Sequence, residues 1–224
     1  MTWRIDGNHL GGSEVAKCRW DLVPFMRGRA LDLGCGPYRA FPHFIGVDNG
    51  KDTEIFGTQI KPNIWADVTD LSFLASDSYD CVFSSHVLEH IEYEKVPTVL
   101  SEWFRLVKKG GYMVLYLPSS DEYPQCDKEK KKEWADWYEK YKNKFHNTEA
   151  AVEEFAEVRR RRGNKKIGEI YAGTPFGNPD HQWDVTYDKV VSAMDIIPYD
   201  WDLIEFEDRN GGDEYSLWFV FVRL

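Results

Sequence analysis

Short runs of apolar residues, each closed by polar residues or glycines, recur along the first half of the chain. They cover 30–33, 45–47, 79–84 and 112–117, and a further short run ends near Asp67. Continuous apolar runs of this length are typical of strands that are buried on both faces of a parallel sheet. The pattern therefore predicts an α/β fold with five strands in this part of the chain.

Apolar residues at helical spacing predict the connections between these strands. From Val96 to Val107 they indicate a helix with Pro97 near its start and with the lysine and glycine pairs of 108–111 at its end. An earlier helix, with an apolar face along 15–26, can be capped by Ser13. Only the eight residues 37–44 follow the second glycine of the turn at 34–36, whereas a parallel crossover takes about a dozen. At most a single helical turn is expected there.

The last forty residues predict a helix and a hairpin. Thr186 would cap a helix that carries Val190, Val191 and Met194 on its apolar side. The segments 201–208 and 215–223 are strand-like, and Asn210-Gly211-Gly212 between them is a strong turn signal. This pattern predicts an antiparallel hairpin at the end of the sheet.

Between residues 119 and 172 the composition shifts to charged and aromatic residues, which predicts a helical insertion after the fifth strand. Aromatic residues at helical spacing from Trp134 to Phe145 could stack a sugar, a flat substrate or a base, or could dock the added helix. The basic run from Arg159 to Lys166 could hold a phosphate or an anionic polymer, or could be the solvated end of a helix.

The stretch from Arg29 to Asn49, RALDLGCGPYRAFPHFIGVDN, has the layout of a nucleoside-cofactor site. The glycines let the backbone N–H groups approach a ligand at the end of a buried strand, and Asp48 at the end of the next strand can accept both hydroxyls of a ribose. NAD is disfavoured, because Arg39 stands where a dinucleotide fingerprint needs its third glycine.

The pattern L-D-x-G-C-G followed by G-V-D resembles motif I and the acidic loop of class I S-adenosylmethionine-dependent methyltransferases. Later segments fit the same family: IWADVTDL, YDCVFSSHVLEHI from Tyr79 to Ile91, and LVKKGGYMVLYLP from Leu106 to Pro118. The short GCGP loop is similar to that of type 11 methyltransferases and of a subgroup found among glycan-related methyltransferases. Four motifs in the family's order make the resemblance specific.

The resemblance implies a fold and a cofactor. The fold is a Rossmann-like, mostly parallel seven-stranded sheet with an antiparallel last strand, helices on both faces and a helical insertion after strand five. Residues 1–224 would form a single methyltransferase domain, with an N-terminal cover at 1–28 and the insertion at about 119–172. The cofactor would be S-adenosyl-L-methionine.

The resemblance also implies which residues hold each part of this cofactor. The methionine end would be held by Asp32 and by the backbone of Gly34, Cys35 and Gly36. The ribose would be held by Asp48 beside Asn49, the adenine by Asp67 or Val68, and the edge of the pocket near the methyl group by Ser84 and Ser85. Asp67 could instead cap the turn before Leu71.

Methyl transfer from a sulfonium is an in-line displacement in which the donor is already activated, so few catalytic side chains are obligatory. A hydroxyl acceptor still needs a base, and histidine is best matched to neutral pH. The first candidate is His181 and the second is His86, although His181 could instead fasten its loop. Some methyltransferases with an E-x-x-E-H pattern bind a divalent metal, but His86 stands at the first glutamate and we expect no metal here.

Composition narrows the partners. A net charge of −10 disfavours a nucleic-acid surface, because polyanions require local positive charge. The four cysteines show no CxxC spacing, which is typical of reduced cytosolic thiols, and no apolar run is long enough to span a bilayer. Together with the aromatic insertion, and with the methyltransferase activity and glycan-related subgroup that the resemblance implies, this composition leads us to expect a cytoplasmic enzyme that methylates a hydroxyl or amine of a small-molecule or glycan-type acceptor. The alternatives are an RNA methyltransferase that uses the basic run, and a non-catalytic subunit that binds S-adenosylmethionine.

Overall fold

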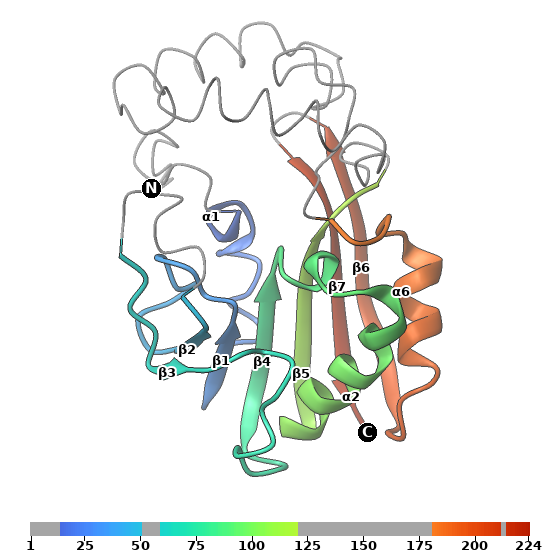
Figure 1. Ribbon diagram of the computed structural model, residues 1–224. Coiled ribbons are helices and arrows are strands. Elements are labelled where there is room, and N and C mark those ends of the chain that lie inside the picture. The colour runs from blue at the N-terminus through green and yellow to red at the C-terminus, as the bar shows by residue number, and fades with distance from the viewer. Residues whose placement is uncertain (1–13, 51–58, 121–180, 212–213) are drawn as a thin grey trace, which may run out of the picture.

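The computed structural model describes residues 14–50, 59–120, 181–211 and 214–224. Their strands form one seven-stranded sheet in the order β3-β2-β1-β4-β5-β7-β6 (Figure 1). The parallel strands are β1 (Ala30–Leu33), β2 (Ile45–Asp48), β3 (Ile64–Trp65), β4 (Tyr79–Ser85) and β5 (Val107–Pro118). The final strands, β6 (Trp201–Gly211) and β7 (Glu214–Arg223), form an antiparallel hairpin, and β7 also runs antiparallel to β5. The predicted α/β sheet is confirmed.

Several predicted features lie outside the described residues. These are the helical insertion, its aromatic residues and the basic run from Arg159 to Lys166, together with Ser13. Among the described residues, no helix has the length and apolar character needed to cross a membrane.

Both faces of the central strands β1 and β4 are buried, as the apolar runs predicted. Alternate residues of β4 serve the two faces: Val82 joins the hydrophobic cluster under α2 (Val96–Leu106) and α6 (Tyr187–Met194), whereas Cys81 and Phe83 join the cluster under α1 (Val15–Cys18). Figure 1 shows α2 and α6 side by side at the right of the sheet, and α1 on the opposite side of the molecule. Thr186 caps α6 as predicted, since its hydroxyl accepts the Lys189 N–H at 3.3 Å.

The N-terminal helix is shorter than predicted. Only 15–18 are helical, and consecutive turns carry the chain on to residue 25. The apolar face is nevertheless as predicted, with Val15, Cys18 and Leu22 buried. The turns close through hydrogen bonds of three- and four-residue spacing, such as Leu22 N–H to Cys18 O at 3.3 Å, so they point the same side chains inward as a helix would.

The predicted end of the longer helix is wrong. Helix α2 ends at Leu106, and the lysine and glycine pairs of 108–111 lie in β5. Val107 already has extended backbone and pairs with Tyr79. A register shift in β4 follows, between Tyr79 and Cys81, and Gly110 supports the irregular backbone with φ +74°. Lys108 therefore does not complement a helix end but pairs with Asp80 at 2.9 Å.

The crossover between β1 and β2 contains no helix, which confirms the short connection that the sequence predicted. Arg39 fastens it, because its guanidinium donates to Phe44 O at 3.2 Å and to Asn63 Oδ1 at 2.7 Å. Ala40 and Phe44 anchor the same segment in the core below α1. The three described cysteines, Cys18, Cys35 and Cys81, are buried free thiols.

Candidate functional site

The predicted cofactor residues gather at the carboxyl ends of β1, β2 and β4, except for Asp67 and Val68, which follow β3. The strand order reverses between β1 and β4, since β2 and β3 follow on one side and β5 on the other. Ligands of open parallel sheets bind at such a switch point, beyond the carboxyl ends of the strands. The structure therefore places the loop after β1, the end of β2 and the end of β4 where a cofactor site is expected.

The two glycines of the loop after β1, Gly34 and Gly36, differ in what surrounds them. Gly34 has φ +69°, and a Cβ built there would lie 2.2 Å from Val87 Cγ2. Packing against Val87 therefore requires glycine at this position. Gly36 also has a positive φ, +53°, but a Cβ built there meets nothing within 4 Å. Open space thus lies beside Gly36, on the side where a ligand could approach the backbone.

The N–H groups of this loop are used within the protein, contrary to the expectation that they face a ligand. Gly34 N–H and Cys35 N–H both donate to Val47 O, at 2.8 and 3.2 Å. Gly36 N–H donates to Asp48 Oδ2 at 3.0 Å. The groups that this loop can offer a ligand are its carbonyl oxygens, which are suited to an ammonium group.

The two acids of the motif hold the loops in place. Asp48 is buried, and its second carboxylate oxygen accepts Gly50 N–H at 2.7 Å. Each carboxylate oxygen has a further lone pair, so Asp48 can still accept a ribose hydroxyl. Asp32 is also buried and accepts Ala40 N–H at 2.7 Å. Burial raises the pKa of Asp32 to about 7. Asn49, which follows Asp48, is exposed.

The residues predicted to contact adenine, Asp67 and Val68, make hydrogen bonds within the protein. Asp67 Oδ1 accepts both the N–H and the hydroxyl of Thr69, at 3.0 and 2.7 Å, so this carboxylate caps the turn as the alternative interpretation had it. Val68 is packed in the core, and its carbonyl accepts the indole N–H of Trp103 at 2.8 Å. Contact of either residue with adenine stays a prediction.

The two serines at the end of β4 have different surroundings. Ser84 is buried and its hydroxyl donates to Leu33 O at 3.1 Å, which ties β4 to β1. Ser85 Oγ is also buried, but it has no hydrogen-bond partner among the described residues. A buried hydroxyl without a partner costs about 1–3 kcal/mol. Ser85 thus offers an unused polar atom at the edge where the reactive end of a cofactor is expected.

A cluster of histidines surrounds Glu89 directly beyond β4. Glu89 lies in the short 3₁₀ turn η1 (Leu88–His90) and is completely buried. Its Oε1 atom lies 3.6 Å from His86 Nδ1, 3.7 Å from His90 Nε2 and 4.0 Å from His181 Nε2. The two predicted catalytic histidines, His86 and His181, therefore belong to one cluster.

His181 is held in this cluster by the backbone next to it. Gln182 N–H donates to Glu89 O at 2.8 Å, and the indole N–H of Trp183 donates to Leu88 O at 3.2 Å. His181 itself is only 2% exposed, and its ring packs edge-on against that of His90. Two hydrogen bonds, from Gln182 and Trp183, thus attach the segment before α6 to η1.

His86 has an unusual backbone and a neutral ring. Its φ is +53°, which is uncommon for a residue other than glycine and is often found at functional sites. Its Nε2 lies 3.1 Å from Ser216 Oγ at the start of β7. Burial lowers the pKa of His86 well below its usual value, and burial raises the pKa of Glu89 to about 7. The His86 imidazole is therefore unprotonated at neutral pH.

Sequence analysis did not single out Glu14, Tyr215 or Ser216, which complete this edge. The Tyr215 hydroxyl donates to Glu14 Oε1, and Lys17 pairs with Glu14 while its ammonium lies 4.1 Å from the centre of the Tyr215 ring. These contacts join α1 to the start of β7. They link opposite ends of the chain, so no local motif could have indicated them.

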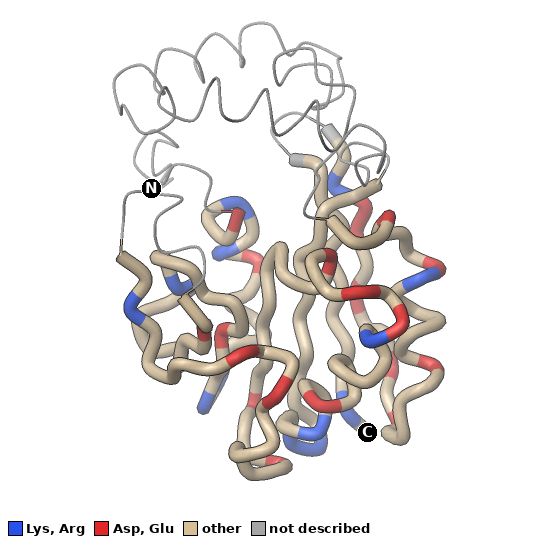
Figure 2. Tube along the Cα trace, in the orientation of Figure 1, with Lys and Arg blue, Asp and Glu red and all other residues tan. Residues whose placement is uncertain are grey.

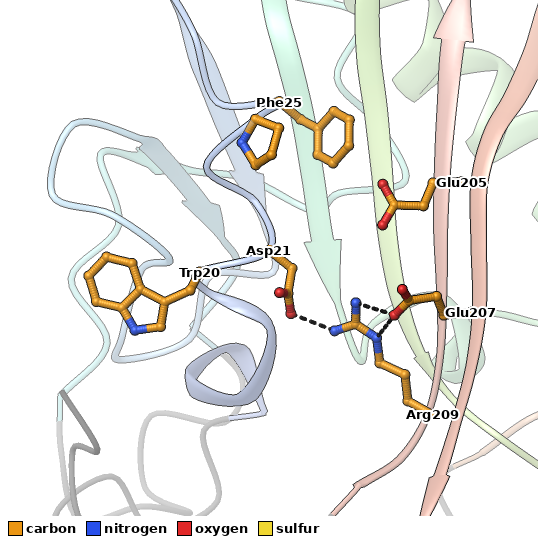
Figure 3. Close-up of a pocket in the computed structure, with 7 residues that line it drawn as sticks. Trp20, Asp21, Phe25, Glu205, Glu207 and Arg209 are labelled. Atoms are coloured by element: carbon orange, nitrogen blue, oxygen red, sulfur yellow. Dashed lines mark hydrogen bonds and ion pairs between the residues drawn. The ribbon is translucent and has the colours of Figure 1, made fainter. Parts of the chain in front are cut away.

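An open groove of about 520 Å³ lies away from the predicted cofactor residues, between the turns after α1 and the outer strand β6. Figure 3 shows Arg209 of β6 reaching across the groove to Asp21, at 2.6 Å, while it also pairs at 2.6 Å with Glu207 of its own strand. The guanidinium also lies 4.8 Å from the Trp218 ring centre. The cation of this groove is thus already paired, and no predicted site residue lines it.

Comparison with known proteins finds a family match in the first half of the chain and a shared fold over nearly all of it. The sequence model of the methyltransferase domain family matches residues 31–115, from β1 into β5. Solved structures with this fold include a SAM-dependent methyltransferase from Archaeoglobus fulgidus, at 16% identity over 93% of this chain and 92% of that one, with a TM-score of 0.53. Another is a SAM-dependent methyltransferase from Mesorhizobium loti, at 14% identity over 96% and 100%, with a TM-score of 0.51. A search of curated proteins found no match. The match over residues 31–115 and the shared fold confirm the resemblance to S-adenosylmethionine-dependent methyltransferases and support an enzyme that uses S-adenosylmethionine.

Proposed function

We propose that this enzyme transfers the methyl group of S-adenosylmethionine to a hydroxyl or amine of a small-molecule or glycan-type acceptor. The observation that carries the proposal is the buried, neutral imidazole of His86, which follows the unpartnered Ser85 hydroxyl at the end of β4. An unprotonated imidazole is the form that a general base requires, and we place it near the reacting end of the cofactor.

The cofactor would lie across the ends of β1, β2 and β4. The carbonyl oxygens of Gly34, Cys35 and Gly36 would receive the methionine ammonium, with Asp32 bracing the crossover through Ala40 N–H. Asp48 would receive the ribose, with Asn49 beside it, and Asp67 or Val68 would border the adenine. The sulfonium would then approach Ser84 and Ser85.

The chemical step would be an in-line displacement. The acceptor oxygen or nitrogen attacks the methyl carbon, the new bond forms as the carbon–sulfur bond breaks, and the sulfur keeps the electron pair as S-adenosylhomocysteine. The proton released by the acceptor would pass to His86. His181 is the second candidate for this role, because it belongs to the same cluster but faces Glu89 and His90 rather than β4.

Charge supports an acceptor that is not a polyanion. Figure 2 shows acidic residues interspersed with basic ones along the described trace, and the whole chain carries a net charge of −10. Nucleic-acid surfaces require concentrated positive charge. The basic run from Arg159 to Lys166 lies outside the described residues and keeps RNA as the alternative acceptor.

The test is methyl transfer from radiolabelled S-adenosylmethionine to panels of sugars, small hydroxyl or amine compounds, and RNA. Transfer to a sugar or small molecule, with turnover lowered in His86→Gln, supports the proposal. Transfer to RNA alone, with binding that falls steeply as salt is raised, would replace it with the RNA alternative. Binding of S-adenosylhomocysteine without transfer to any acceptor would favour a non-catalytic subunit.

A further inference from the structure

The carboxylate of Glu89 is buried and makes no hydrogen bond with the part of the chain that the structure describes. The residue is completely buried, and neither carboxylate oxygen has a hydrogen-bond partner among the described residues. Burying a carboxylate in this way is costly unless it is paired or coordinates a metal ion. Around it stand imidazole nitrogens at 3.6 to 4.0 Å, too far for hydrogen bonds but close enough to share a small ion.

Three of these residues have the arrangement of a metal site. One ligand atom each from Glu89, His90 and His181 can be chosen so that all three atoms lie within 4.8 Å of one another. Two ligands on a tetrahedral zinc ion, bound at about 2.0–2.2 Å, lie roughly 3.4 Å apart. The observed separations of 3.7 and 4.0 Å from Glu89 Oε1 therefore need to shorten only slightly. We propose that Glu89, His90 and His181 bind one divalent transition-metal ion of the Zn²⁺ type.

The donor set indicates the class of metal. Two imidazole nitrogens and one carboxylate oxygen are typical of catalytic zinc sites, which keep a further position open, and of related first-row metal sites. Mg²⁺ and Ca²⁺ prefer oxygen ligands throughout. His90 gives access to the site, since 43% of its side chain is exposed whereas Glu89 and His181 are buried.

The three ligands are not the ones that the sequence pattern implied. That pattern grouped His86 with Glu89 and His90, and the substitution at its first position spoke against a metal. In the structure His86 is not a member of the three-residue group, although its Nδ1 lies 3.6 Å from Glu89 Oε1; its Nε2 lies 3.1 Å from Ser216 Oγ. His181, from the segment before α6, takes the third place. Under this proposal His86 remains available as the proton acceptor and His181 serves as a ligand.

The site lies beside the expected path of the acceptor, so an open coordination position could bind an acceptor oxygen and ease loss of its proton. This role rests on the proposed function, whereas metal binding does not. The two claims can fail separately, because metal binding is measured without cofactor or acceptor.

The experiment is titration of the chelator-treated full chain with Co²⁺, followed by visible absorption and equilibrium dialysis and then by Zn²⁺ competition. We expect one Co²⁺ per chain, with absorption bands of four- or five-coordinate cobalt that Zn²⁺ abolishes. Glu89→Gln and His181→Gln should each weaken binding at least tenfold. His43→Gln is the matched control, since His43 is exposed and packs against Phe41 and Phe44 on the crossover.

Circular dichroism and S-adenosylhomocysteine affinity separate loss of a ligand from loss of the fold. If a buried substitution unfolds the chain, His90→Gln takes its place, because His90 is largely exposed. Absence of stoichiometric Co²⁺ binding by the folded wild-type chain would overturn the proposal. So would binding that a folded Glu89 or His90 variant leaves unchanged, since the metal would then sit elsewhere.

Discussion

His181 Nε2 faces the Glu89 carboxylate at 4.0 Å, and the next backbone N–H, that of Gln182, donates to Glu89 O at 2.8 Å. The contact joins the segment before α6 to the turn after β4. The cluster around Glu89 is therefore held by two parts of the chain, the end of β4 and the segment before α6. Substitutions in either segment should alter the same cluster.

Replacing Asp48 with alanine should weaken binding of S-adenosylhomocysteine by about ten- to a hundred-fold. The carboxylate receives Gly36 N–H and Gly50 N–H, and under the proposed function also the ribose. A hydrogen bond to a charged group contributes about 1.5–3 kcal/mol, and 1.4 kcal/mol is tenfold in affinity. Calorimetric titration measures the change, with NAD as a ligand that should give no signal.

Asp48→Asn is the matched variant, because its amide oxygen can keep one of the two backbone bonds. Its loss of affinity should be smaller than that of Asp48→Ala. Equal affinity of wild type and Asp48→Ala for S-adenosylhomocysteine would refute the placement of the ribose.

Replacing His86 with glutamine should lower turnover about 10²–10⁴-fold and leave S-adenosylhomocysteine affinity within about twofold. The reason is that the neutral imidazole is proposed to accept the acceptor's proton and not to hold the cofactor. Steady-state kinetics on the acceptor found in the screen, together with calorimetry, separate the two effects. A variant with normal turnover would exclude His86 as the base.

The strands of this fold were predictable because their signal is local. Each apolar run from Ala30 to Leu117 became a strand, since burial on both faces requires no polar alternation. The prediction of a helix from 13 to 26 was wrong about the backbone for a related reason. Inward residues at 15, 18 and 22 fit either a helix or a series of turns, so the periodicity predicted the burial but not the backbone.

The site was less predictable because its contacts are not local. The sequence predicted site residues at the end of β4 and, separately, at His181. It could not show that the Gln182 N–H donates to Glu89 O and so holds these two segments together. The motif likewise placed Gly36 and Asp48 correctly at one edge, whereas the direction of the loop N–H groups depends on Val47 and Asp48 of the neighbouring strand.

The two glycines after β1 should respond differently to alanine. Gly34→Ala places a Cβ 2.2 Å from Val87 Cγ2 and requires alanine to adopt a positive φ. We expect it to lower the free energy of unfolding by about 3 kcal/mol or more, from backbone strain together with overpacking. Gly36→Ala meets no neighbour, so it should cost about 1–2 kcal/mol of stability from its positive φ.

For variants that remain folded, we expect Gly36→Ala to lose more cofactor affinity than Gly34→Ala, the opposite of their order in stability. The methyl group of Gly36→Ala would project into the open space beside the loop, so S-adenosylhomocysteine should bind at least several-fold more weakly. Urea unfolding and calorimetry on the two variants test the pair. A Gly36→Ala protein that binds the cofactor as tightly as wild type would show that the ligand does not approach this face of the loop.

Asp32 should make the stability of the apo enzyme depend on pH. Its pKa is raised by burial from 3.8, the value expected in the unfolded chain, to about 7 in the folded one. Between about pH 4 and pH 7 the folded state therefore holds a proton that the unfolded state has released, and stability falls as pH rises through this window. Below pH 4 both states are protonated, and above pH 7 the loss is complete.

Asp32→Asn isolates this effect, because asparagine cannot ionise and its amide oxygen can still accept Ala40 N–H. The free energy of unfolding of Asp32→Asn minus that of wild type should rise between pH 4 and pH 7. The rise should reach on the order of a few kcal/mol, since one pKa unit corresponds to about 1.4 kcal/mol. Urea unfolding of both proteins across this range, without cofactor, measures it. Other titrating groups are common to the two proteins and largely cancel, so a difference that stays constant from pH 4 to pH 8 would mean that Asp32 ionises normally in the folded chain.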